Sequence, residues 1–315
     1  MRKYIIRRLL SLIPVLFVVS LAIFLLIHLV PGDPAAAILG EEASPEQIEA
    51  LRETLGLNEP ILQQYLHWLR GLFHGNWGTS LFMEGTMLEI IGSHMVPTLQ
   101  QTLVAIGFAT LAGVPLGMIA AIRQGSPADR IISSFAAVGM ALPSFLMGLC
   151  LVLLFSVNLR WLPSSGYKTI ADFGWQTHIR YMLLPGIALG FIEMGLIIRM
   201  TRSSMLEVLS ADYMRMAKAK GVSRSRMFMK HAFRNALVGI LTVVGLSFIS
   251  CLGGAVVTET IFNIPGLGKL TLNAVMRRDY EVVQAVVLLV SLINVVCTLI
   301  LDLLYAVIDP RVRLN

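Results

Sequence analysis

Charged residues are scarce in this sequence, because Lys, Arg, Asp and Glu make up only 14% of its 315 residues. Soluble domains are typically about a quarter charged and about 45–50% apolar, whereas 56% of this chain is apolar. This shortage excludes a large soluble core and predicts an integral membrane protein. The net charge of +6 does not indicate nucleic-acid binding, because the basic residues concentrate in segments between apolar runs.

Cysteines and nucleotide-binding motifs are scarce as well. The three cysteines lie far apart in apolar stretches and are Cys150, Cys251 and Cys297. Their spacing excludes a disulfide framework or a metal site built on cysteine. Residues 266–269 resemble a phosphate-binding loop, but Asn263 stands where its first glycine is needed and Leu270 replaces the Ser or Thr. We therefore expect no catalytic residue, cofactor or metal in this chain, and ATP hydrolysis, if any, in partner subunits.

Six apolar segments are long enough to cross a bilayer, which takes about 20 residues as a helix. They are 9–30, 98–122, 131–157, 181–198, 236–257 and 282–307. Pro143 interrupts the third segment, which predicts a kink or a break. The sequence thus predicts an all-α membrane fold with six transmembrane helices. The first apolar run is too long for a secretory signal and is expected to stay uncleaved.

The distribution of basic residues predicts the orientation of these helices. Nine Lys and Arg residues lie in 199–234, whereas 31–96 carries nine acidic and only two basic residues. Four more basic residues precede the first apolar run, namely Arg2, Lys3, Arg7 and Arg8. Because basic loops stay in the cytoplasm, we expect both termini and 199–234 inside and 31–96 outside.

Three parts of the chain are expected from this layout. They are residues 1–30 with the first helix, an external subdomain at 31–97 and a core at 98–315 with five helices. Helical patterns at 45–55 and 60–72 predict an ordered subdomain, with Ser44 as a helix cap. Two GxxxG pairs inside the spans predict close helix packing, Gly113/Gly117 and Gly186/Gly190.

The basic segment 199–235 holds a helix, a turn and a second helix. Residues 211–220 are good helix formers, and Gly221 follows where a left-handed residue ends a helix. Ser223 can cap a second helix that runs through 224–235 into the next span. A short helix at the end of a span can act as a lever, because force on it moves the span.

Several motifs in this chain resemble those of one transporter family. DYMRMAKAKG (212–221) and KHAFRNAL (230–237) resemble the cytoplasmic loop of binding-protein-dependent ABC importer permeases. Four further motifs resemble one branch of this family, the dipeptide, oligopeptide, nickel and glutathione permeases. They are RRLLSLIP (7–14), GNWGTS (75–80), TETIFNIPGLGKL (258–270) and DLLYAVIDPRVR (302–313). One departure concerns the Glu-Ala-Ala of the wider pattern, of which only Ala217 is kept, together with Gly221.

The resemblance implies a type I ABC importer permease subunit in the bacterial inner membrane that moves peptides or related small solutes by alternating access. It implies a second permease, two cytoplasmic ATPase subunits that bind ATP and Mg²⁺, and an external substrate-binding protein. It also implies ATPase-coupling residues, which are Asp212, Tyr213, Arg215, Ala217, Lys218, Ala219, Lys220 and Gly221.

Acidic residues in apolar runs leave alternatives open. Glu193 and Asp302 are costly in lipid and fit either structural pairing or a proton relay, which would make the chain a proton-coupled secondary transporter. Glu259 fits either a substrate contact or a helix cap. Glu193 and Glu259 are the candidate residues of a translocation pathway. A scaffold or exporter subunit, and a nickel or glutathione importer, are further alternatives.

Overall fold

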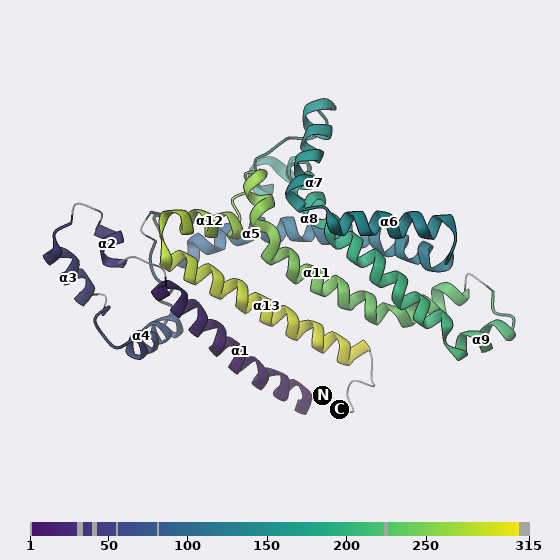
Figure 1. Ribbon diagram of the computed structural model, residues 1–315, viewed down its shortest axis with the longest axis horizontal. Helices are drawn as coiled ribbons and strands as arrows, with labels where there is room; N and C mark the ends of the chain where they lie inside the picture. The colour runs from purple at the N-terminus through teal and green to yellow at the C-terminus, as the bar shows by residue number, and fades with distance from the viewer. Residues whose placement is uncertain are drawn as a thin grey trace. The chain divides into compact units, whose positions relative to one another are not determined.

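The computed structural model describes residues 2–29, 34–39, 43–54, 56–80, 82–223 and 226–308, and the regular elements within them are all helices (Figure 1). The chain divides into two compact units. One comprises 1–5, 95–269 and 296–315, and the other comprises 6–94 and 270–295. The predictions made for 31–33, Arg224 and the basic residues after 308 lie outside the described residues.

The first unit contains a chain of helices that begins inside α5. Its elements are α5 (Met87–Ile122), α6 (Pro127–Ala141), α7 (Ser144–Leu151), the π-helix η1 (Val152–Asn158), α8 (Ile170–Ser210), α9 (Asp212–Ala219), the π-helix η2 (Met227–Phe233) and α11 (Arg234–Ile261). α8 is the most buried of the membrane-length helices. It is also longer than its predicted span 181–198, because the helix continues past Arg199 and Arg202 to Ser210.

Glycines bring α5 and α8 close together along their length. A Cβ on Gly113 would lie 2.9 Å from the side chain of Ile197, and one on Gly117 would lie 2.7 Å from that of Thr201. At the other end, Gly190 abuts the backbone of Ala105. The predicted small-residue packing is therefore confirmed. Residue numbers rise together along both helices, so α5 and α8 run in the same direction.

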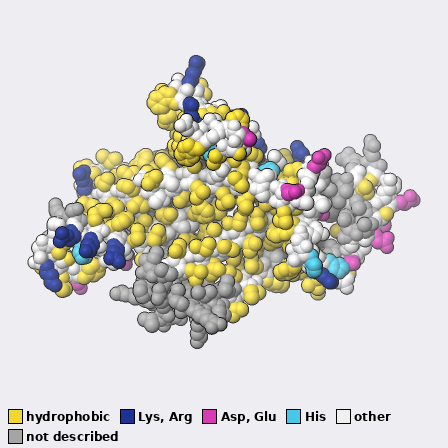
Figure 2. Space-filling view, turned by 180° about the vertical axis from the view of Figure 1, so that it is seen from behind, with side chains coloured by type: hydrophobic (Ala, Val, Ile, Leu, Met, Phe, Trp, Pro, Cys, Tyr) yellow, Lys and Arg dark blue, Asp and Glu magenta, His cyan; other side chains and the backbone are white. Residues whose placement is uncertain are grey.

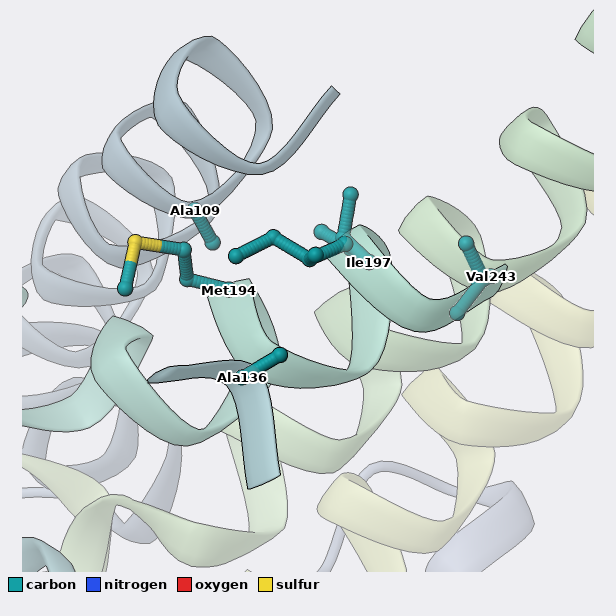
Figure 3. Close-up of a cluster of buried hydrophobic side chains, with 6 residues drawn as sticks. Ala109, Ala136, Met194, Ile197 and Val243 are labelled. Atoms are coloured by element: carbon teal, nitrogen blue, oxygen red, sulfur yellow. The ribbon is translucent and has the colours of Figure 1, made fainter. Parts of the chain in front are cut away.

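The core of this unit lies where four helices meet. Ala109 of α5, Ala136 of α6, Met194 and Ile197 of α8, and Val243 of α11 form one buried cluster (Figure 3). Burying such side chains yields roughly 25 cal/mol per Å² in water, but in lipid the close fit itself holds helices together. The core therefore depends on shape, with alanines where the helices approach.

α6 and α7 are two halves of one predicted span. α6 ends at Ala141, α7 begins at Ser144, and the axes of the two halves meet at 104°. Pro143 stands at this break, as the sequence predicts. Gly195 of α8 faces Ala136, and further along Gly148 of α7 faces Ala188. α6 thus runs against the direction of α8, as a return path between two parallel helices requires, and α7 then turns away from the axis of α6.

The second unit combines α1 (Arg2–Leu29), α2 (Pro34–Leu39), α3 (Pro45–Thr54), α4 (Ile61–Phe73), most of α12 (Leu267–Arg277) and the first half of α13 (Tyr280–Ile308). α4 packs on α1 through Tyr65, whose hydroxyl lies 2.8 Å from that of Ser20. Ser44 caps α3, because its hydroxyl accepts from the N–H of Gln47, whose side chain accepts in return from the N–H of Ser44. The predicted cap is confirmed. α12 lies between the predicted spans 236–257 and 282–307, where the sequence predicts no helix.

Residues 75–80 are fixed against the start of α13 within this unit. Glu281 accepts from the backbone N–H of Thr79 at 2.5 Å, and Asp279 accepts from the hydroxyl of Ser80 at 2.7 Å. Gly78 has a φ of +92°, and a Cβ there would lie 2.5 Å from the Glu281 carboxylate. The GNWGTS motif is therefore a tight loop that requires glycine at this position.

Four described helices are long and apolar enough to cross a membrane, and the α6–η1 pair makes a fifth. They are Met87–Ile122, Ile170–Ser210, Met227–Ile261 and Tyr280–Leu304. α1 coincides with the first predicted span, and its apolar part, Leu10–Leu25, is shorter than the other membrane-length helices. Each of the six predicted spans therefore coincides with a helix or with the bent pair.

Candidate functional site

α9 and the turn after it form the helix-turn-helix expected from the sequence. Asp212 lies in the first turn of α9, where a negative charge is favourable. Gly221 has a φ of +76°, and the N–H of Val222 donates to the carbonyl of Ala217 at 3.2 Å. This is the Schellman arrangement, in which a left-handed glycine ends a helix. The second helix differs from expectation, because it begins as the π-helix η2 before continuing as α11.

One side of α9 is anchored to the ends of the long helices. Met214 is 3% exposed and belongs to a buried cluster with Ala121, Met205, Ala232, Ala236 and Ile240. Asn235 donates through its amide to the hydroxyl of Tyr213 at 3.2 Å. This cluster joins α9 to residues of α5, α8, η2 and α11, so we expect a displacement of α9 to act on these elements.

The other side of α9 is exposed and mixes apolar with charged side chains. Tyr213 is 45% and Met216 60% exposed. Four more predicted residues are also exposed, namely Asp212, Arg215, Ala219 and Lys220, while Ala217 is half-buried. Figure 2 shows basic side chains gathered over the region of α9. The side chain of Lys218 lies outside the described part. Exposed Tyr and Met beside basic residues are typical of a protein-binding surface.

Glu193 and Glu259, the two predicted pathway residues, are both buried in the first unit. Glu193 lies on α8 at 7% exposure, and no hydrogen bond or ion pair joins its side chain to another described residue. Glu259 lies near the end of α11 at 0% exposure. Both residues belong to the first unit, but they lie on different helices and have different neighbours.

The carboxylate of Glu259 is bound on both oxygens. Thr98 of α5 donates its hydroxyl to Oε1 at 2.6 Å, and the N–H of Lys269 donates to Oε2 at 2.9 Å. Thr98 accepts in turn from the N–H of Leu267 at 2.8 Å. The side chain thus caps the first turn of α12, which is one of the two readings of Glu259. Thr98 is a contact that the sequence does not predict, since it lies 161 positions from Glu259.

Among the described residues, no group of three His, Cys, Asp or Glu side chains is placed to hold a metal ion. Asp302 lies on α13 and is half-buried, with an interaction to a neighbour. The described residues therefore contain two candidate sites. One is the exposed face of α9, where a partner could bind and move the helix, and the other is the buried hydrogen-bond network around Glu259.

Comparison with known proteins agrees with this architecture. The chain matches the family described as binding-protein-dependent transport system inner membrane component over residues 113–314, and its N-terminal part over residues 1–83. A probable peptide ABC transporter permease protein, y4tP of Sinorhizobium fredii, is 43% identical over 313 residues, which cover 99% of this chain and 100% of that protein. The glutathione transport system permease protein GsiC of Escherichia coli K12 is 42% identical, with 99% of both chains covered.

Solved structures share the fold. A chain of the MetNI methionine ABC transporter in an inward-facing conformation superposes with a TM-score of 0.61 at 16% identity, covering 72% of this chain and 100% of that one. The fold is therefore that of a type I ABC importer permease. The family match and the two permease relatives decide against a proton-coupled carrier, a scaffold or an exporter, and in such importers ATP is hydrolysed by a separate subunit. The chain belongs to the binding-protein-dependent inner membrane components, and it is a permease subunit of an ABC importer.

Proposed function

We propose that this chain is one of two permease subunits in an importer that also holds two ATPase subunits and receives a substrate-binding protein. α9 is the contact for an ATPase subunit, through Asp212, Tyr213, Arg215, Ala217, Lys218, Ala219, Lys220 and Gly221. The observation that carries this proposal is the two-sided character of α9. Its buried side lies in a cluster with residues of four other elements, and its exposed side presents Tyr213 and Met216, which are 45% and 60% exposed.

Transport is driven by the ATPase subunits, which bind ATP and Mg²⁺. ATP binds the closed ATPase pair more tightly than the open one, and only such differential affinity can shift the permease between its states. The closing subunits move α9, and α9 moves α8 and α11, because Met214 packs against Met205 and Ala236. Of the two candidate pathway residues, the buried acid Glu193 is the one that this movement would expose to cargo, whereas Glu259 is held by Thr98 and Lys269.

The assembly is tested by its composition. A tagged chain co-expressed with the subunits encoded beside it is expected to purify with one other permease and two ATPase subunits, as measured by native mass spectrometry. Ala217→Trp is expected to lose the ATPase subunit facing it and keep the second permease, because the added ring occupies the proposed contact. A complex that contains this chain without any ATPase, in both wild type and variant, would contradict the proposal.

We propose an orientation in which both termini and α9 face the cytoplasm and 31–97 forms an external subdomain. The charge distribution supports it, and so does the parallel course of α5 and α8, which requires the bent pair to cross the membrane between them. The core at 98–315 then holds five spans, with α1 as the sixth.

Cysteine labelling in intact cells tests this orientation. Single cysteines replacing Glu49 and Lys220, both exposed, are introduced into a chain without its native cysteines. We expect a membrane-impermeant maleimide to label the Glu49 position, and the Lys220 position only after the cells are opened. The reverse pattern would show that α9 faces outward and would exclude its contact with an ATPase.

Peptides of a few residues are the cargo that we propose, glutathione included. This rests on the two relatives, a probable peptide permease and a glutathione permease. In such an importer the substrate-binding protein selects the cargo. Calorimetric titration of that protein with di- and tripeptides, glutathione and a nickel chelate therefore separates the peptide, glutathione and nickel alternatives.

A further inference from the structure

An ion pair between a buried carboxylate and a half-buried guanidinium joins the first turn of α6 to α8. Arg202 donates from Nε to Oδ1 of Asp129 at 2.6 Å and from Nη2 to Oδ2 at 2.8 Å. This two-point fork fixes the orientation of the two helices as well as their distance. Asp129 is 6% exposed in its side chain, whereas the carboxylates of the other ion pairs in the described part of the chain are 38% exposed or more.

The Asp129 carboxylate also holds the turn between α5 and α6. The N–H of Gly125 donates to its Oδ2 at 2.9 Å, and the hydroxyl of Ser133 donates to its Oδ1 at 3.3 Å. Gly125 has a φ of +77° in that turn. One carboxylate therefore connects the end of α5, the start of α6 and the side of α8.

Arg202 lies between this connection and α9. Met205, three residues further along α8, packs in the same buried cluster as Met214 of α9. Thr201, the residue before Arg202, touches α5 at Gly117. Because α8 has helical backbone throughout 175–210, a movement imposed at Met205 reaches Arg202 one turn away.

We propose that Asp129 and Arg202 are positioning residues that transmit a displacement of α9 to α6 and through it to the bent span α6–η1. The proposal rests on the proposed role of α9 as the ATPase contact. Close to this end of α8, the fork is the polar link that resists both sliding and rotation of α8 against α6. Ala136 and Gly139 approach α8 through backbone and an aromatic ring rather than through charged side chains, and these contacts resist sliding less.

A purely structural role predicts something different. Replacing both partners of a buried ion pair with neutral groups is often neutral or stabilising, whereas removing one partner leaves an uncompensated buried charge. The double variant Asp129→Asn/Arg202→Gln therefore separates the two roles. It removes the unpaired charge that destabilises each single variant, but it does not restore the charged two-point connection.

The experiment uses the complete importer in liposomes and a pool of radiolabelled di- and tripeptides that contains glutathione. We expect the double variant to assemble and to hydrolyse ATP at nearly the wild-type rate, while the peptide moved per ATP hydrolysed falls about tenfold, in the range of typical coupling between sites. Arg202→Lys keeps the charge without the fork and is expected to fall between the two. Arg199→Gln, one turn earlier on α8 and exposed, removes the same charge and is the control.

Wild-type transport per ATP in the double variant would overturn the proposal, and so would its failure to assemble, because the pair would then be needed only for folding. Ala217→Trp is measured in the same series. Normal coupling in Ala217→Trp counts against the proposed contact of α9, whereas normal coupling in the double variant counts against the ion pair alone.

Discussion

Gly221→Val is expected to abolish transport while the protein remains in the membrane. Gly221 has a φ of +76° and ends α9 in a Schellman arrangement. A left-handed conformation costs a residue with a Cβ roughly 1–2 kcal/mol, and the branched Val more. The turn after α9 then changes its backbone conformation, and the exposed face of α9 is no longer oriented toward the ATPase subunit. A Cβ at Gly221 would meet no other atom within 4 Å, so the effect is confined to the backbone of this turn.

Ala217→Trp tests the same contact from the other side. Ala217 is half-buried on α9, and an indole there blocks a partner without straining the turn. We expect uptake of labelled peptides by both variants in liposomes to fall at least about tenfold, with normal amounts of protein in the membrane. The matched control is Gly75→Val, because Gly75 has a φ of +82° and equally open surroundings in the second unit.

The outcome that rejects the coupling role is specific. Normal uptake and normal stimulation of ATP hydrolysis by the loaded binding protein, in both Gly221→Val and Ala217→Trp, would show that α9 is not the ATPase contact. Loss of uptake in Gly75→Val as well would show that backbone strain alone, wherever it occurs, disables the protein.

Features set by neighbouring residues are predictable from this sequence. The six apolar segments all coincide with helical segments, Pro143 marks the break between α6 and α7, and Gly221 ends α9. The GxxxG pairs lie where α5 and α8 touch. These signals are local, because length, a missing N–H and a missing Cβ act within a few residues.

Features that depend on tertiary contacts are not predictable from one sequence. The charges at Arg199 and Arg202 indicate the end of a span, yet α8 continues to Ser210, because arginine is a good helix former. The bond of Arg202 to Asp129, 73 positions away, is not predictable either. The sequence does not predict α12, because the carboxylate that accepts from an N–H group of its first turn belongs to Glu259 of α11. A lone acid among basic residues, as at Asp129 in 123–130, is the signal that a search for ion pairs could have used.

Glu259→Ala is expected to destabilise the protein strongly. The carboxylate is fully buried and accepts from the hydroxyl of Thr98 and the N–H of Lys269, and its removal leaves both donors without it. Each unsatisfied buried group costs about 1–3 kcal/mol, so the sum is on the order of 4 kcal/mol. The midpoint of thermal unfolding in detergent should then fall by about 10 °C. Glu259→Gln, which keeps one accepting oxygen, is expected to lose about half as much.

The same variants separate the two roles open to Glu259. Thr98→Val removes the hydroxyl partner but leaves the carboxylate, so a structural clasp predicts that it lowers the unfolding midpoint in the same direction. Thr260→Val alters an exposed hydroxyl that bonds within its own helix and serves as the control. A clasp keeps α11, α5 and the start of α12 together, so transport and stability should fall in step across the series. If Glu259→Ala instead unfolds at the wild-type temperature and loses only transport, its carboxylate acts on cargo in the pathway and the hydrogen bonds to Thr98 and Lys269 contribute little to the fold.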